Sequence, residues 1–316
     1  MPWHAGIDEN GLGPQLGPML VTAVMARVSE SARQGLRQDG TRFLHERLDD
    51  SKALVSHGKV ALAEAWARAV AERCKIRASS PDALVEALAL EQRHQRVSMC
   101  PDLGLTQCWS AEGEGFEADE AQVDAARQDL DLLDRRGIDV VWARSLIVCV
   151  RALNEARHNG CGRFESDLHA MERLILAARA EACQDIEVVC GKVGGLQRYV
   201  PAMSVLGDRL HTVLGEERAC SSYGFPGVGI VHFRRDADGS DPLVALGSLV
   251  GKYLRELLMK RIVRFYQRQE PELPDASGYN DPVTARFVRA TLARRRRLGI
   301  PDLCFRREQA SDSKDE

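Results

Sequence analysis

The sequence predicts an α/β fold in which helices flank a mixed β-sheet, with a helical extension at the C-terminal end. Two observations predict it: two apolar segments near the N-terminus are typical of hairpin-paired strands, and strand-like and helix-like segments then alternate along the chain. With 316 residues, the chain has room for about two domains of roughly 150 residues, or for one domain with insertions. Hydrophobic residues make up 44% and charged residues 28%, a composition that excludes a disordered or fibrous chain.

The first half of the chain begins with the two strands. Residues 3–8 form a short strand that runs into the glycine-rich turn 10–14, and the valine-containing segment 19–28 forms its partner. Residues 55–73 have apolar side chains at helical spacing and predict a helix. The remaining elements expected here are a strand at 76–78, a helix from Pro81 through Leu90, and a segment at 139–150 that fits either a strand or a helix.

The second half continues the alternation. A helix is expected over residues 166–182, with Ser166 as its N-cap and Leu168, Met171 and Leu174 on one apolar face. The other elements expected are strands at 185–190 and 228–233, a long helix at 243–267, a loop at 268–282 and a basic helix at 283–298.

Charge divides the chain into regions. Residues 1–267 form the main domain, with an acidic insertion at about 97–137, followed by a basic helical segment at 268–307 and a disordered tail at 308–316. Between Lys252 and Arg307 there are 14 Lys and Arg against 6 Asp and Glu. Such a segment either is a solvated helix face or follows nucleic-acid phosphates. The acidic insertion either docks a protein partner or shields the basic segment.

Cysteine usage and hydropathy point to a cytoplasmic protein. The nine cysteines include no C-x-x-C pair, so zinc and redox motifs of the usual kind are not expected, and reduced thiols are. No apolar run approaches the roughly 18 residues that span a bilayer. The N-terminus lacks a basic stretch followed by an apolar one, so no signal peptide and no membrane association are expected.

The residues most indicative of chemistry are Asp8 and Glu9, which leave the first strand just before the turn Gly11-Leu12-Gly13. Adjacent carboxylates repel each other unless a cation lies between them, and Mg²⁺ prefers one or two carboxylates together with phosphate oxygens. Glycines expose backbone N–H groups and permit close approach. This pattern indicates a hard-metal site beside a phosphate- or ribose-binding turn, while the alternative is an ordinary turn.

The segment from Gly6 to Pro14, followed by Gly17-Pro18, resembles the opening motif of ribonuclease HII, a type 2 ribonuclease H. Further segments resemble that family in the same order along residues 4–290. They are Asp50 to Leu54, the helix 166–182 with the strand 186–190, Arg235-Asp236 after a strand, Ser248 to Lys252, and Ser277-Gly278-Tyr279.

The resemblance implies a ribonuclease H-like mixed sheet and a monomeric endoribonuclease. Such an enzyme cleaves the RNA strand of RNA–DNA hybrids, or ribonucleotide-containing duplex DNA, with Mg²⁺ or Mn²⁺ as cofactor. Both the choice of metal and the choice between long hybrids and single ribonucleotides stay open. Carried over position by position, the catalytic metal ligands are Asp8, Glu9 and Asp236. The substrate-binding residues are Gly11, Leu12, Gly13, Ser51, Lys52, Lys252 and Tyr279, and the basic segment holds the duplex.

The chain departs from the family pattern at two positions. The third metal-binding aspartate falls on Cys190, and sulfur is a poor ligand for Mg²⁺. Glu187 is three residues away on the same strand and is therefore expected on the opposite face, whereas Lys192 is expected to offset part of the charge of the two leading acids. Leu12 stands where ribonuclease HII has arginine. The alternative hypothesis is therefore a catalytically weak or inactive relative that binds hybrid nucleic acid.

Overall fold

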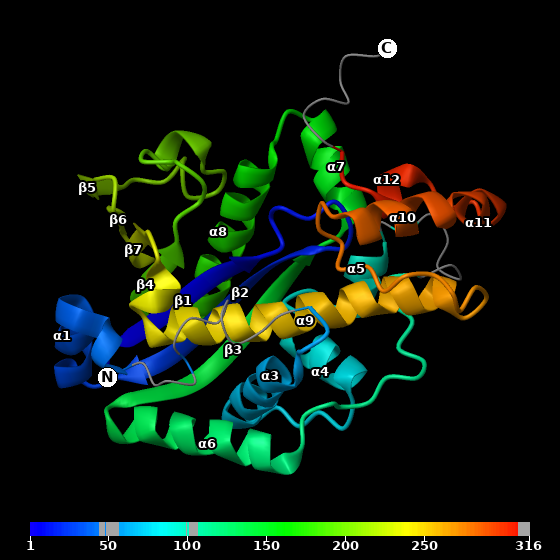
Figure 1. Ribbon diagram of the computed structural model, residues 1–316. Coiled ribbons are helices and arrows are strands. Elements are labelled where there is room, and N and C mark those ends of the chain that lie inside the picture. The colour runs from blue at the N-terminus through cyan, green and yellow to red at the C-terminus, as the bar shows by residue number, and fades with distance from the viewer. Residues whose placement is uncertain (44–47, 49–56, 99, 101–106, 309–316) are drawn as a thin grey trace.

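The computed structural model describes residues 1–43, 48, 57–98, 100 and 107–308. A seven-stranded sheet in the order β3-β2-β1-β4-β7-β6-β5 forms its centre (Figure 1). The strands are β1 (Trp3–Asn10), β2 (Met19–Val28), β3 (Ile138–Val148), β4 (Ile186–Gly191), β5 (Thr212–Glu216), β6 (Cys220–Phe225) and β7 (Gly229–Arg234).

The sheet is mixed, as the sequence predicts. β1 pairs antiparallel with β2 and parallel with β4, β4 pairs parallel with β7, and the outer strands pair antiparallel. The carboxyl ends of β1, β4 and β7 therefore lie at one edge of the sheet. In α/β folds this is the edge where ligands usually bind.

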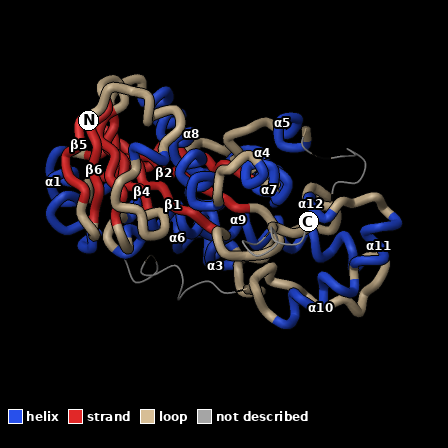
Figure 2. Tube along the Cα trace, turned by 90° about the horizontal axis from the view of Figure 1, so that it is seen from above, coloured by secondary structure: helices blue, strands red, loops and turns tan. Residues whose placement is uncertain are grey.

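Helices cover both faces of the sheet and continue into a C-terminal helical region, which confirms the predicted fold class (Figures 1 and 2). One apolar cluster lies between the sheet and α8, and a second lies between the other face and α3, α6 and α9. The helices are α1 (Glu30–Asp39), α3 (Ala61–Arg73), α4 (Pro81–Leu88), α5 (Arg93–Val97), α6 (Glu120–Arg135), α7 (Val150–His158), α8 (Arg163–Ala182), α9 (Pro242–Gln267), α10 (Pro282–Ala290), α11 (Leu292–Arg297) and α12 (Asp302–Phe305).

The start of α9 is fixed directly against β1. Asp241 caps the helix by accepting hydrogen bonds from the backbone N–H groups of Leu243 and Val244, and it also pairs with His4 of β1 at 2.7 Å. Gly6 permits this contact, because a Cβ at that position would lie 2.1 Å from the backbone nitrogen of Val244. The arrangement brings residues 247–251 of α9 to the end of β1.

Three sequence predictions are wrong in their details. Residues 76–78 form no strand, because the chain turns after Cys74 and only packs its side chains against the core. Ser166 is not an N-cap: its N–H already donates to the carbonyl of Gly162, which caps a helix beginning at Arg163. The basic helix expected at 283–298 is divided into α10 and α11 at Thr291.

Two segments gain a definite structure. The ambiguous segment 139–150 is mainly the edge strand β3, and the glycine-rich stretch before β7 contains the unpredicted hairpin β5–β6. Within residues 97–137, which the sequence predicts to be an acidic insertion, α6 packs against α3 and β3. Arg73 of α3 binds Asp131 and Asp134 of α6 at 2.8 and 2.5 Å, so part of the negative charge of α6 is paired with the neighbouring helix at the surface.

None of the helices in the described part of the chain combines the length and the apolar character that crossing a membrane requires.

Candidate functional site

A cavity of about 780 Å³ lies at the sheet edge where β1, β4 and β7 end. We call it the glycine-turn cavity, because the turn Gly11-Leu12-Gly13 forms part of its wall. It brings together most residues that the sequence singles out, namely Asp8, Glu9, Gly11, Leu12, Gly13, Asp236, Lys252 and Tyr279. Ser51 and Lys52 lie outside the described residues.

Asp8 is the central acid of this cavity. It is half-buried, and removal of its carboxyl group from water raises its pKa to about 7, with smaller increases from the negative charges of Asp238 and Glu9. Ser248 of α9 opposes the shift through a hydrogen bond to the carboxylate. A Cβ built at Gly191 would lie 3.0 Å from Oδ1 of Asp8, so β4 passes directly beside this acid.

Glu9 connects the acids to the glycine turn, because its Oε1 accepts a hydrogen bond from the backbone N–H of Leu12. The turn needs glycine at position 11, where φ is +94°. Its carbonyls are held from outside: Arg307 donates to Gly11 O and Arg163 donates to Leu12 O. The turn is therefore fixed to the C-terminal segment and to α8.

The acid that the sequence assigns to the end of β7 is Asp236. Asp236 lines the cavity, but its side chain is 84% exposed and pairs with Arg235 at 3.6 Å. Asp238, two residues later, also lines the cavity, and its charge acts on Asp8. Asp238 is thus a second candidate for the role that the sequence assigns to Asp236, and Asp236 stays a prediction.

Cys190 lies at the end of β4 opposite Ile7 and is fully buried, outside the cavity lining. Burial raises the pKa of its thiol well above the ordinary value, and the charges of Asp167 and Asp8 add to the rise. Glu187 faces the opposite side, as predicted from strand periodicity, and binds Arg37 of α1 at 2.8 Å.

Lys192 does not neutralise the leading acids. It lines the cavity but donates to the backbone carbonyls of Glu217 and Arg218 at 2.8 and 3.1 Å. The prediction that Lys192 offsets part of the negative charge of Asp8 and Glu9 is therefore wrong.

Sequence reasoning missed Asp167, which α8 places next to the acids of β1. Burial, followed by the negative charges of Glu9 and Asp8, raises the pKa of Asp167 well above the usual aspartate value. A signal for it exists: Asp167 precedes Met171 and Leu174 by four and seven residues, so a charged side chain lies on the apolar face of the helix.

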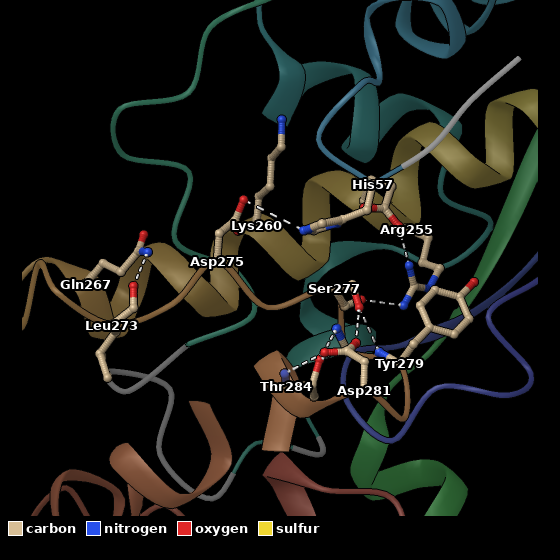
Figure 3. Close-up of polar contacts among 12 residues, drawn as sticks. His57, Arg255, Lys260, Gln267, Leu273, Asp275, Ser277, Tyr279, Asp281 and Thr284 are labelled. Carbon is tan, nitrogen blue, oxygen red and sulfur yellow. Dashed lines mark hydrogen bonds and ion pairs between the residues drawn. The ribbon is translucent and has the colours of Figure 1, made fainter. Parts of the chain in front are cut away.

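Tyr279 lies at another wall of the cavity, where a polar network holds its loop (Figure 3). The hydroxyl of Ser277 accepts a hydrogen bond from the N–H of Tyr279 at 3.2 Å and donates to Asp281 at 2.8 Å. Arg255 of α9 donates to the carbonyl of Ser277 and lies 4.5 Å from the centre of the Tyr279 ring. One face of the ring thus packs against the guanidinium group of Arg255, while 47% of the Tyr279 surface stays exposed.

The basic segment contains two kinds of arginine. Arg295 is buried, stacks on Phe305 at 3.9 Å and donates to the carbonyl of Val288 at 3.0 Å, so it holds the C-terminal helices together. Arg296 and Arg297 are exposed. Only part of the run Arg294 to Arg297 can therefore contact phosphates.

The donor set fits a divalent cation in its chemistry. Asp8 interacts electrostatically with Glu9, Asp238 and Asp167, and carboxylate oxygens suit Mg²⁺ and Mn²⁺, whereas the thiol of Cys190 does not. Oδ1 of Asp167 is buried without a hydrogen-bond partner among the described residues. In the same described ranges, no three His, Cys, Asp or Glu side chains form a group that could hold a metal, so the carboxylates are not preassembled.

No protein-family model matches the chain, and no curated protein matches it in sequence. Among solved structures, it is similar to ribonuclease HII of Archaeoglobus fulgidus in complex with PCNA, with a TM-score of 0.42 and 14% identity over 99% of this chain and 97% of that chain. Ribonuclease H2 of Pyrococcus horikoshii gives 0.41 and 15% over 96% and 92%. Bst-RNase HIII in complex with Mn²⁺ gives 0.41 and 10% over 92% and 71%. At these values the likeness carries no residue role or activity over to this chain.

Proposed function

We propose that the protein is a divalent-metal-dependent endoribonuclease of the ribonuclease H type. Its substrates would be RNA–DNA hybrids, cut in the RNA strand, or duplex DNA cut at embedded ribonucleotides. The observation that carries the proposal is the convergence of Asp8, Glu9, the glycine turn and Tyr279 on one cavity. These residues come from both ends of the chain and match the motifs that resemble ribonuclease HII.

Different walls of the cavity would bind different parts of such a substrate. The backbone of Gly11 and Gly13 would contact the ribose 2′-OH, the group that distinguishes RNA from DNA. The exposed face of the Tyr279 ring would stack on the sugar, with Arg255 behind it. Lys252 and Arg218, which also line the cavity, would attract the phosphate backbone.

The acids would hold the cation at the phosphate to be cut. Asp8 and Glu9 are its proposed ligands, joined by Asp238 or Asp236 from the end of β7. When bound, a divalent cation would supply the Lewis acid that activates water and stabilises charge on the leaving oxygen. The chain's own contribution is to keep Glu9 in place through the N–H of Leu12 and Asp8 through Ser248.

A second candidate function is hybrid binding with weak or no cleavage. Two observations favour it: the position of the third family aspartate is occupied by the buried thiol of Cys190, and the described carboxylates form no ready three-ligand group. Loss of electrostatic stabilisation at a reacting phosphate commonly costs orders of magnitude in rate. Binding through the glycine turn, Tyr279 and the basic residues would survive that loss.

Cleavage of a labelled duplex separates the two candidates. A DNA duplex with one embedded ribonucleotide and a continuous RNA–DNA hybrid are incubated with the protein in Mg²⁺, in Mn²⁺ and in EDTA. Metal-dependent nicking would support the endoribonuclease, and Asp8→Asn should abolish nicking while affinity for the duplex persists. Binding without nicking in either metal would favour the second candidate, and the absence of both would refute the proposal.

The two candidates for the acid of β7 provide a matched comparison. Asp238→Asn should lower the rate at least as strongly as Asp236→Asn, because the charge of Asp238 acts on Asp8 while the side chain of Asp236 points largely to solvent. A loss confined to Asp236→Asn would assign the ligand role to Asp236, in agreement with the motif.

A further inference from the structure

Asp167 is an acid in an apolar position. α8 packs against β1 and β4, and its apolar face joins Leu168 and Met171 to Ile7 and Cys190 in one cluster. Asp167 lies in this interface with 1% of its surface exposed. A carboxylate buried in such a place is costly unless it is paired or binds a metal.

Other buried acids of the chain have partners that explain their burial. Glu172, five residues further along α8, accepts hydrogen bonds from the backbone N–H of Leu206 at 2.7 Å and from the hydroxyl of Ser204 at 2.8 Å. Asp241 binds His4 and caps α9. In contrast, Oδ1 of Asp167 has no hydrogen-bond partner among the described residues.

The neighbours of Asp167 make its burial still less favourable in the absence of a cation. The charges that act on it most strongly are the carboxylates of Glu9 and Asp8, both of which line the glycine-turn cavity. The negative charges of Asp167 and Asp8 both raise the pKa of the Cys190 thiol. Two carboxylates, those of Asp167 and Asp8, thus act on the place at which β4 carries sulfur in place of a carboxylate, and Glu9 acts on Asp167 in turn.

We propose that Asp167 supplies the third carboxylate of the metal site, so that the acid missing from the strand position Cys190 comes from helix α8. A divalent cation between Asp8, Glu9 and Asp167 would remove their mutual repulsion and give the free oxygen of Asp167 a partner. Because the described carboxylates are not preassembled, their side chains must move toward the cation on binding. This inference rests on the proposed function and specifies its metal site.

Metal binding without substrate tests the assignment. The full-length protein is titrated with Mn²⁺ and with Mg²⁺, and the melting temperature and the binding isotherm are recorded for the wild type, Asp167→Asn and Glu172→Gln. Asp167→Asn should melt no lower than the wild type in EDTA, because it removes a buried repulsive charge. It should bind the metal at least about tenfold more weakly, since loss of even an outer-shell partner costs about 10–100-fold.

Glu172→Gln is the matched control on the same helix. It removes the charge of a buried acid that holds Ser204 and Leu206, so it should lower the melting temperature and leave the rise caused by metal unchanged. A merely structural role for Asp167 would give the behaviour of this control instead. Full metal affinity in Asp167→Asn would overturn the inference.

The double variant Asp167→Asn with Cys190→Asp returns the acid to the strand. It should bind metal more tightly than Asp167→Asn does. If the single variant fails to fold, the double variant decides the question, because a folded double variant without metal binding would overturn the inference.

The ligand role of Asp167 and the proposed function can be refuted separately. If the wild type cleaves in the presence of metal and the Asp167→Asn variant binds metal normally, only the ligand role of Asp167 is refuted. A wild type with neither metal binding nor cleavage would refute both.

Discussion

Arg307 is expected to hold the glycine turn in shape from the opposite end of the chain. Its side chain is buried and donates to the carbonyl of Gly17 at 3.0 Å from Nε and 2.7 Å from Nη2, and to the carbonyl of Gly11 from Nη1. Its own N–H donates to the carbonyl of Gln15 at 2.9 Å. The substitution Arg307→Ala removes the side-chain bonds and keeps the backbone bond.

The magnitude follows from the acceptors left behind. Two buried carbonyls, those of Gly11 and Gly17, lose a charged donor, and each buried acceptor without a partner costs about 1–3 kcal/mol. The guanidinium no longer has to be buried, which offsets part of this cost. The free energy of unfolding should therefore fall by about 2–4 kcal/mol.

Urea denaturation followed by far-UV circular dichroism measures this change. Arg306→Ala is the control, because the neighbouring side chain is exposed and its loss should change stability by at most about 0.5 kcal/mol. A weaker affinity of Arg307→Ala for a ribonucleotide-containing duplex should accompany the loss, since the turn is its proposed contact. Equal stabilities of the two variants would refute this account of the turn.

Three further predictions concern the exposed arginines of α11, Tyr279 and His57. Replacing Arg296 and Arg297 with Ala should weaken duplex binding and flatten its dependence on salt without lowering the melting temperature, and an unchanged slope would remove this segment from the interface. Tyr279→Ala should weaken binding of a ribonucleotide-containing duplex more than Tyr279→Phe does, because stacking needs the ring; equal losses, measured by fluorescence anisotropy, would argue against stacking. His57 hydrogen-bonds Glu256 at 2.8 Å, which raises the pKa of His57 above 6.5. The stabilising effect of protonated His57 should therefore be complete below about pH 6.5 and vanish as pH rises through the folded pKa. Urea denaturation at pH 5.5 and pH 9 should show His57→Gln destabilised only at the lower pH.

Local patterns in the sequence determine much of this fold. The strand β2 begins and ends where its apolar run does, and the long helix α9 starts within one residue of the predicted position, because Asp241 and Pro242 are strong N-terminal signals. Short or ambiguous segments depend on partners elsewhere in the chain. The segment that became β3 is a strand because β2 offers it an edge, and the hairpin β5–β6 forms against β7 despite a glycine-rich sequence.

The same division holds at the candidate site. Asp8, Glu9 and the glycine turn are adjacent in the sequence, so their chemistry can be predicted from the chain alone. Asp167 and Asp238 reach Asp8 only because α8 packs across β1 and β4 and because the chain turns after β7. Likewise, the arginines near the C-terminus all look alike in sequence, and tertiary contacts separate buried Arg295 and Arg307 from exposed Arg296 and Arg297. Charge repulsion and burial depend on how closely segments that are far apart in the sequence approach each other, and only the folded chain sets that approach.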